Sequence, residues 1–313
     1  MMEEKKKTVG KAEEMLKSCR LCPRACKVNR IEGEKGYCGA SLQMRIARAD
    51  LHFWEEPCIS GKSGSGAVFF SGCNLRCIFC QNYEIANQLK GKCFSPMELA
   101  ECFLELEQKG ANNINLVSAS PYLPQLILAI RQAKKMGLQI PLLYNSSGYE
   151  TAEAIRLLDG LIDIYLPDFK YMDRQMAKEY SKAPDYPDRA KEALAEMVRQ
   201  TGGAKMHFSE DGLMKKGVIV RHLLMPGHVR NAKAVLEYLY ASFGDDIYIS
   251  ILQQYTPILS NSRIREDALL SRRVTQREYE RLLDYALELG IKNAFIQERG
   301  VAKESFIPSW NLS

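Results

Sequence analysis

The sequence AVFFSGCNLRCIFC covers residues 67–80 and joins a short apolar run to three cysteines. Its first part, residues 67–71, is rich in branched and aromatic side chains and predicts a buried strand. The cysteines follow at once as Cys73, Cys77 and Cys80, in a C-x3-C-x2-C pattern. Three thiolates can hold a [4Fe–4S] cluster, and because no fourth cysteine follows at ligand spacing, one iron would stay open to an outside ligand.

Similar apolar runs recur along the chain, and helical patterns or loops separate them. The runs cover residues 114–118, 140–145, 162–168, 218–225 and 247–253, with a weaker one at 293–297. Ser95 and Thr275 each begin a capping box, and Gly110 and Gly290 follow the helices that these boxes start. Strands that alternate with helices predict a parallel sheet covered on its faces. We therefore expect an α/β fold, a partial (β/α)6 TIM-like barrel with a Cys-rich N-terminal extension.

All ten cysteines of the 313-residue chain lie between Cys19 and Cys102. A disulfide framework would spread its cysteines over the whole chain, so this clustering indicates metal or redox chemistry in a reducing compartment. The N-terminus lacks the apolar core of a signal peptide, and no apolar run approaches the roughly 18 residues of a membrane span. We expect a soluble, cytoplasmic protein with no membrane partner.

A second group of cysteines, Cys19, Cys22, Cys26 and Cys38, precedes the triplet. Four thiolates saturate either a tetrahedral zinc ion or a second iron–sulfur cluster, and the spacing leaves both open. We expect residues 1–60 to form a Cys-rich extension around this candidate metal site. Residues 61–313 would then form the barrel domain with C-terminal helical additions.

The N-terminal segment is also basic, with twelve Lys and Arg against six Glu in residues 1–48. A basic, Cys-rich segment offers an alternative class of function, a metal-dependent nucleic-acid-binding module. Stacking on bases requires aromatic side chains, and Tyr37 is the single aromatic residue in this segment. The composition therefore favours an enzyme over a protein that binds nucleic acid.

The cysteine triplet, with Phe79 before its last cysteine, resembles the signature of the radical S-adenosylmethionine (SAM) superfamily. The resemblance implies that Cys73, Cys77 and Cys80 hold a [4Fe–4S] cluster whose open iron binds the methionyl part of SAM. Phe79 would pack near the adenine. Reductive cleavage of SAM would give a 5′-deoxyadenosyl radical that abstracts hydrogen from a substrate, with an electron donor such as flavodoxin or ferredoxin as partner.

Three further motifs resemble glycyl-radical-enzyme activases of the pyruvate formate-lyase-activating-enzyme-like subgroup. They are Cys80-Gln81-Asn82, Asp168-Phe169-Lys170 and the stretch RHLLMPG at residues 221–227. The resemblance implies that Lys170 reaches the SAM carboxylate and that Asp168 lines the SAM or substrate side. It also implies contacts with the nucleoside part of SAM from Asn145, Arg221, the Leu223 backbone and Tyr255.

The chain departs from these activases at the end of the second predicted strand. The activases usually carry Gly-Gly-Glu there to hold the SAM amino group, whereas this chain has Ser118-Ala119-Ser120. The hydroxyl groups of Ser118 and Ser120 could accept hydrogen bonds from that ammonium group. A glycine of a partner enzyme is the expected substrate, and a small molecule or a non-glycyl protein side chain remains an alternative.

Overall fold

The computed structural model describes residue 10 and residues 14–297. Seven parallel strands form the centre of this part of the chain, and neighbouring strands follow one another in chain order. They are β2 (Ser65–Phe70), β4 (Ile114–Val117), β5 (Leu142–Ser146), β6 (Ile164–Pro167), β8 (Met214–Leu223), β9 (Tyr248–Leu252) and β10 (Ala294–Ile296). Each coincides with one of the predicted apolar runs, although β8 begins four residues earlier than its run. The predicted α/β fold is thus confirmed.

Antiparallel strands extend this sheet beyond β2. Strand β1 (Met44–His52) pairs with β2, with Asp50 opposite Ala67, and β3 (Lys92–Phe94) pairs with β1. A short strand, β7 (His207–Phe208), pairs with β8. Because β3 and β10 lie at opposite ends of the strand order, the barrel is open. Strand β1 belongs to this sheet although it lies within the expected extension of residues 1–60, so the sheet begins before that boundary.

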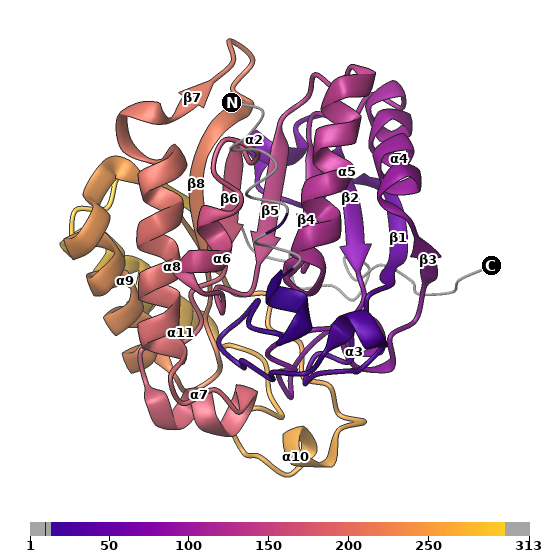
Figure 1. Cartoon of the computed structure of the whole chain (residues 1–313). Coiled ribbons are helices and arrows are strands. Elements are labelled where there is room, and N and C mark those ends of the chain that lie inside the picture. The colour runs from indigo at the N-terminus through magenta and orange to yellow at the C-terminus, as the bar shows by residue number, and fades with distance from the viewer. Residues whose placement is uncertain (1–9, 11–13, 298–313) are drawn as a thin grey trace.

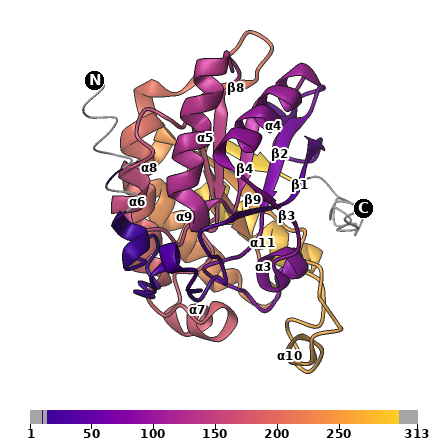
Figure 2. The ribbon, with the colours of Figure 1, turned by 45° about the vertical axis from the view of Figure 1, so that its right-hand side comes forward.

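Helices cover the outer face of the sheet, as Figures 1 and 2 show for α4, α5, α8 and α9. The helices are α2 (Pro57–Ser60), α3 (Tyr83–Gln88), α4 (Pro96–Gln108), α5 (Leu123–Met136), α6 (Ala152–Arg156), α7 (Arg174–Ser181), α8 (Tyr186–Thr201), α9 (Val229–Phe243), α10 (Ser262–Arg265) and α11 (Gln276–Glu288). Ser95 and Thr275 form the predicted capping boxes at the starts of α4 and α11. Within the described ranges, no helix combines the length and apolar character needed to cross a membrane.

The parallel strands all end on the same side of the molecule. In Figure 1 the arrowheads of β2 and β5 point to the lower end, where the indigo N-terminal segment, α3, α7 and α10 lie. Ligands of such folds bind at the carboxyl ends of the strands. Gly148, after β5, has a φ of +75°, and a Cβ there would lie 2.1 Å from the Asp168 carbonyl oxygen. This glycine therefore allows the loops after β5 and β6 to approach each other at the site.

Candidate active site

An open cavity of about 480 Å³ lies at the carboxyl ends of the strands. This volume falls within the range of small-molecule and cofactor sites. Except for Ser120, every residue predicted to serve the catalytic cluster or SAM lines it, whatever its distance along the chain. These residues are Cys73, Cys77, Phe79, Cys80, Ser118, Asn145, Asp168, Lys170, Arg221, Leu223 and Tyr255. The structure therefore brings together side chains from the ends of six different strands.

The loop that carries the cysteine triplet is held in place by groups from distant parts of the chain. The Asn74 side chain donates to the Tyr149 carbonyl (2.6 Å), and the Asn74 carbonyl accepts from Arg24 Nε (2.8 Å). The Ile78 amide donates to the Tyr180 carbonyl at 2.9 Å. A loop fixed from several sides keeps the three sulfur atoms in place, which is the preorganisation that a cofactor site requires.

The three thiols have surroundings that suit metal-bound thiolates. The Leu75 amide lies 3.4 Å from Cys73 Sγ, the Asn82 amide donates to Cys80, and Ser181 Oγ donates to Cys77 Sγ at 2.9 Å. Burial and the neighbouring thiols raise the pKa of Cys77 and Cys80, although the positive charge of Lys170 opposes this. The ionised form of these cysteines is therefore disfavoured in the absence of a metal. The iron ions of a bound cluster would supply the positive charge that stabilises the thiolates.

Asp168 and Lys170 form an ion pair just beyond β6. Lys170 Nζ lies 2.5 Å from Asp168 Oδ2, and the two side chains are 18% and 31% exposed. Burial lowers the pKa of Lys170, but the Asp168 carboxylate and the Cys77 and Cys80 thiols outweigh this and raise it above its ordinary value. Lys170 is consequently a permanent positive charge beside the cysteine triplet.

Phe79 and Tyr255 form an aromatic wall of the cavity. Their ring centroids are 6.3 Å apart at an interplanar angle of 60°. The ring of Phe79 also meets Tyr180 edge to face, with centroids 6.5 Å apart. The hydroxyl of Tyr255 donates to the Leu270 carbonyl at 2.7 Å, so its ring rather than its hydroxyl is available on the cavity side. Such a wall suits a flat ligand ring.

Arg221 binds two carboxylates that the sequence analysis did not identify. Its guanidinium donates to both oxygens of Glu56, from Nε at 2.8 Å and from Nη2 at 2.6 Å, and it also donates to Glu55. Burial raises the pKa of Glu56, but Arg221 outweighs this and holds it below its ordinary value. Glu55 and Glu56 lie about 165 residues away in sequence, so no local motif marks this partnership. The predicted nucleoside contact of Arg221 stays a prediction.

The two serines that replace Gly-Gly-Glu differ in their positions. Ser118 lines the cavity, with a left-handed φ of 61°. Ser120 is buried and donates to Glu150 at 2.7 Å, while Ser146 donates to the other Glu150 oxygen at 3.1 Å. The pKa of Glu150 is raised to about 7 because it is buried. The hydrogen bonds from the two serine hydroxyls lower this pKa, but by less than burial raises it. Ser120 is thus committed to a buried carboxyl group, and Ser118 remains beside the cavity.

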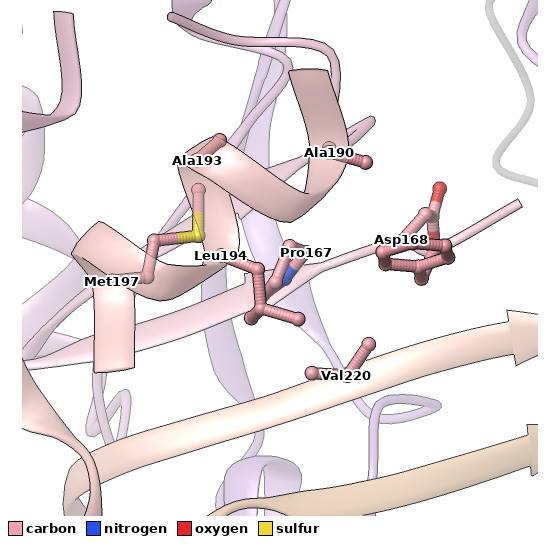
Figure 3. Close-up of a pocket in the computed structure, with 9 residues that line it drawn as sticks. Pro167, Asp168, Ala190, Ala193, Leu194, Met197 and Val220 are labelled. Carbon is pink, nitrogen blue, oxygen red and sulfur yellow. The ribbon is translucent and has the colours of Figure 1, made fainter. Parts of the chain in front are cut away.

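A smaller apolar space lies behind Asp168, between α8 and the strands β6 and β8 (Figure 3). Pro167, Leu194, Met197 and Val220 line it, and it has no room for a water molecule. This space is therefore part of the core. The packing of α8 against the end of β6 supports Asp168 from behind, and ligand binding belongs to the larger cavity.

The N-terminal cysteines gather close to the triplet loop. The charges of Cys19, Cys26 and Cys38 act on Cys22, and burial raises the pKa of Cys22 to about 12. In the part of the chain that the structure describes, no set of three or more His, Cys, Asp or Glu side chains is arranged to hold a single metal ion. This holds for both cysteine groups.

Comparison with known proteins identifies the family. A model of the radical SAM superfamily matches residues 67–239, more than half of the chain, so the chain belongs to that superfamily. The family predicted from the cysteine triplet is confirmed. The chain is accordingly a radical SAM enzyme, and the cofactors of this superfamily are a [4Fe–4S] cluster and SAM.

The individual relatives do not identify the substrate of this chain. The chain is 28% identical over 282 residues to uncharacterized protein MJ0674 of Methanocaldococcus jannaschii, covering 88% of this chain and 76% of that one. It is 10% identical to SuiB of Streptococcus suis bound to precursor peptide SuiA, with a TM-score of 0.47. This match covers 72% of the present chain but only 46% of SuiB. It is 15% identical to a domain of pyruvate-formate lyase-activating enzyme from Bacteroides vulgatus, with a TM-score of 0.34, covering 54% of this chain and 87% of that domain. TM-scores below 0.5 carry no argument about what this chain binds.

Proposed function

We propose that this radical SAM enzyme abstracts a hydrogen atom from a glycine of a partner protein, as a glycyl-radical-enzyme activase. The observation that carries the proposal is the convergence of the cysteine triplet and the Asp168–Lys170 pair on one cavity. When bound, the cluster and SAM supply reductive cleavage of the SAM C–S bond, after one electron arrives from a flavodoxin or ferredoxin. The products are methionine and 5′-deoxyadenosine, whose new hydrogen comes from the substrate.

The residues of the cavity have separate tasks in this proposal. Cys73, Cys77 and Cys80 would hold the cluster and leave one of its irons open to SAM. Lys170 would neutralise the SAM carboxylate, because it is a partly buried cation next to the triplet. Asp168 keeps the Lys170 ammonium pointed into the cavity through the 2.5 Å ion pair.

The remaining residues of the cavity would bind the nucleoside part of SAM. Phe79 offers a ring face to the adenine, beside the ring of Tyr255. Asn145 and Leu223 offer polar contacts to the ribose and base from the ends of β5 and β8. Ser118 accepts from the SAM ammonium group in place of the activase carboxylate. Arg221, held by Glu55 and Glu56, would contact the nucleoside from the end of β8.

The rim of the cavity supports a protein substrate. Phe53, Trp54 and Ile296 line the cavity and are 49%, 62% and 53% exposed. Exposed apolar groups at a cavity mouth are typical of surfaces that bind another protein.

The proposal is tested with a candidate glycyl radical enzyme under anaerobic conditions. Reconstituted, reduced protein and SAM are mixed with the candidate, and the electron paramagnetic resonance (EPR) spectrum is recorded. We expect a doublet from a carbon-centred glycyl radical, and we expect the candidate's glycine-to-alanine variant to abolish it. Formation of 5′-deoxyadenosine without a doublet for any candidate would favour a small molecule or another protein side chain as substrate.

A further inference from the structure

The two cysteine groups are joined directly through Tyr37 and Arg24. The Tyr37 amide donates to Cys26 Sγ at 3.2 Å, and the Tyr37 hydroxyl donates to the Leu75 carbonyl within the triplet loop at 3.3 Å. The Arg24 guanidinium stacks over the Tyr37 ring at 4.1 Å and donates to the Asn74 carbonyl. The N-terminal cysteines therefore rest on the loop of the catalytic cluster.

Both groups share one pattern of backbone hydrogen bonds to sulfur. In the triplet, Cys73 and Cys80 accept from the amide two residues later, from Leu75 and Asn82. In the N-terminal group, Cys22 and Cys38 accept in the same way from Arg24 and Ala40. Amide donors stabilise the thiolate form of cysteine, which is the form that binds metal. The N-terminal loop thus shares its hydrogen bonds to sulfur with the loop of the cysteine triplet.

A buried cation beside these cysteines lacks an anionic partner. Arg30 is 1% exposed, and its Nη1 and Nη2 donate to the carbonyls of Pro121 and Ser41 at 2.5 Å each. Its Nε is buried without a hydrogen-bond partner, and no carboxylate among the described residues pairs with it. The positive charge of Arg30 acts on Cys38. An unpaired buried charge is costly, so an anionic centre at the cysteines would stabilise Arg30.

We propose that Cys19, Cys22, Cys26 and Cys38 bind a second iron–sulfur cluster, closed by four thiolates and seated on the loop of the catalytic cluster. A zinc ion needs all its sulfur ligands within about 2.3 Å of one point. Among the described residues the N-terminal cysteines are not grouped in that way, and in this they resemble the triplet, which we assign to a cluster. Because every iron would already have its thiolate, this second cluster has no open position for SAM.

The metal content of the full chain tests this site without any measurement of activity. Protein reconstituted anaerobically with iron and sulfide is analysed for iron, sulfide and zinc. We expect about eight iron atoms per chain, two clusters of four, and no stoichiometric zinc. The variant Cys73→Ala/Cys77→Ala/Cys80→Ala should keep about four, with an EPR signal that does not change when SAM is added.

The variant Cys22→Ala/Cys38→Ala should also keep about four iron atoms, but its EPR signal should change with SAM. The control Cys93→Ala, an exposed cysteine on β3, should keep all the iron of the parent chain. One zinc atom per chain, or a triplet variant that binds no iron while its circular dichroism matches the parent's, would overturn the second cluster. Neither outcome depends on the substrate, so failure here leaves the proposed function untouched.

Discussion

Lys170 Nζ lies 2.5 Å from Asp168 Oδ2 inside the cavity that the cysteine triplet lines. The two residues are separated by one position at the end of β6, and they project to the same side. The pair thus places a partly buried positive charge beside three thiols, where it could pair with the carboxylate of an amino acid bound at the open iron.

We predict that Lys170→Met weakens SAM binding by about tenfold or more, since the variant loses a partly buried, charge-assisted contact. The measurement is the Kd of SAM from the change in the EPR signal of the reduced cluster. Lys178→Met, an exposed lysine on α7, is the matched control and should bind SAM as the parent does. Equal affinity of the Lys170 variant and the parent would remove Lys170 from the SAM site.

Arg221 should matter for stability because it is the one cation that pairs with Glu55 and Glu56 among the residues that the structure describes. Their side chains are 8% and 4% exposed. Arg221→Met leaves two buried carboxylates facing each other and should lower the free energy of unfolding by about 3–5 kcal/mol. Denaturant titration measures this.

The matched control for Arg221 is Arg174→Met, which breaks the exposed Arg174–Asp188 pair. An exposed ion pair contributes about 1 kcal/mol or less, so this variant should stay close to the parent. Equal losses for the two arginines would mean that the Glu55–Glu56 pair is better solvated than the structure describes.

Glu150 should make stability depend on pH. Its pKa is raised from 4.5 to about 7, so between these values the folded chain keeps a proton that the unfolded chain has lost. The contribution of Glu150 to the free energy of unfolding should therefore be fully present below pH 4.5. It should decrease by about 3 kcal/mol as the pH rises from 4.5 through 7.

Glu150→Gln stays neutral, so its free energy of unfolding should exceed that of the parent at pH 8 and should lack this decrease. Glu196 provides the opposite case, because its hydrogen bond with Arg199 lowers its pKa. Glu196→Gln should therefore destabilise the chain at pH 8. If the free energy of unfolding of the parent rose from pH 5 to 8 by as much as that of Glu150→Gln, the raised pKa of Glu150 would be contradicted.

The parallel strands and the active-site cysteines could be predicted because their signals are local. Each buried strand is an apolar run, and the triplet is a spacing within one loop. Strand β1 was not predicted, because its sequence MRIARADLH mixes charged and apolar residues. It becomes a strand by pairing with β2, a contact that its own residues do not reveal.

Arg221 and Ser120 show the same limit within the site. Both were predicted from the resemblance to bear on SAM, and both have partners that only the folded chain brings close. Arg221 meets Glu55 and Glu56 from the segment before α2, and Ser120 meets Glu150 from the loop after β5. Side chains at strand ends can be assigned to a cavity from sequence, whereas their pairing across the barrel depends on long-range packing.

The production of 5′-deoxyadenosine tests the central claim most directly, namely that the cysteine triplet holds a cluster that cleaves SAM. The parent chain and Cys77→Ala are reconstituted anaerobically, reduced and incubated with SAM, and the nucleoside is quantified by chromatography. Cys93→Ala serves as the exposed-cysteine control. The account predicts 5′-deoxyadenosine from the parent and from Cys93→Ala and only background from Cys77→Ala. Equal amounts from the parent and Cys77→Ala, or none above background from an iron-loaded parent, would contradict it.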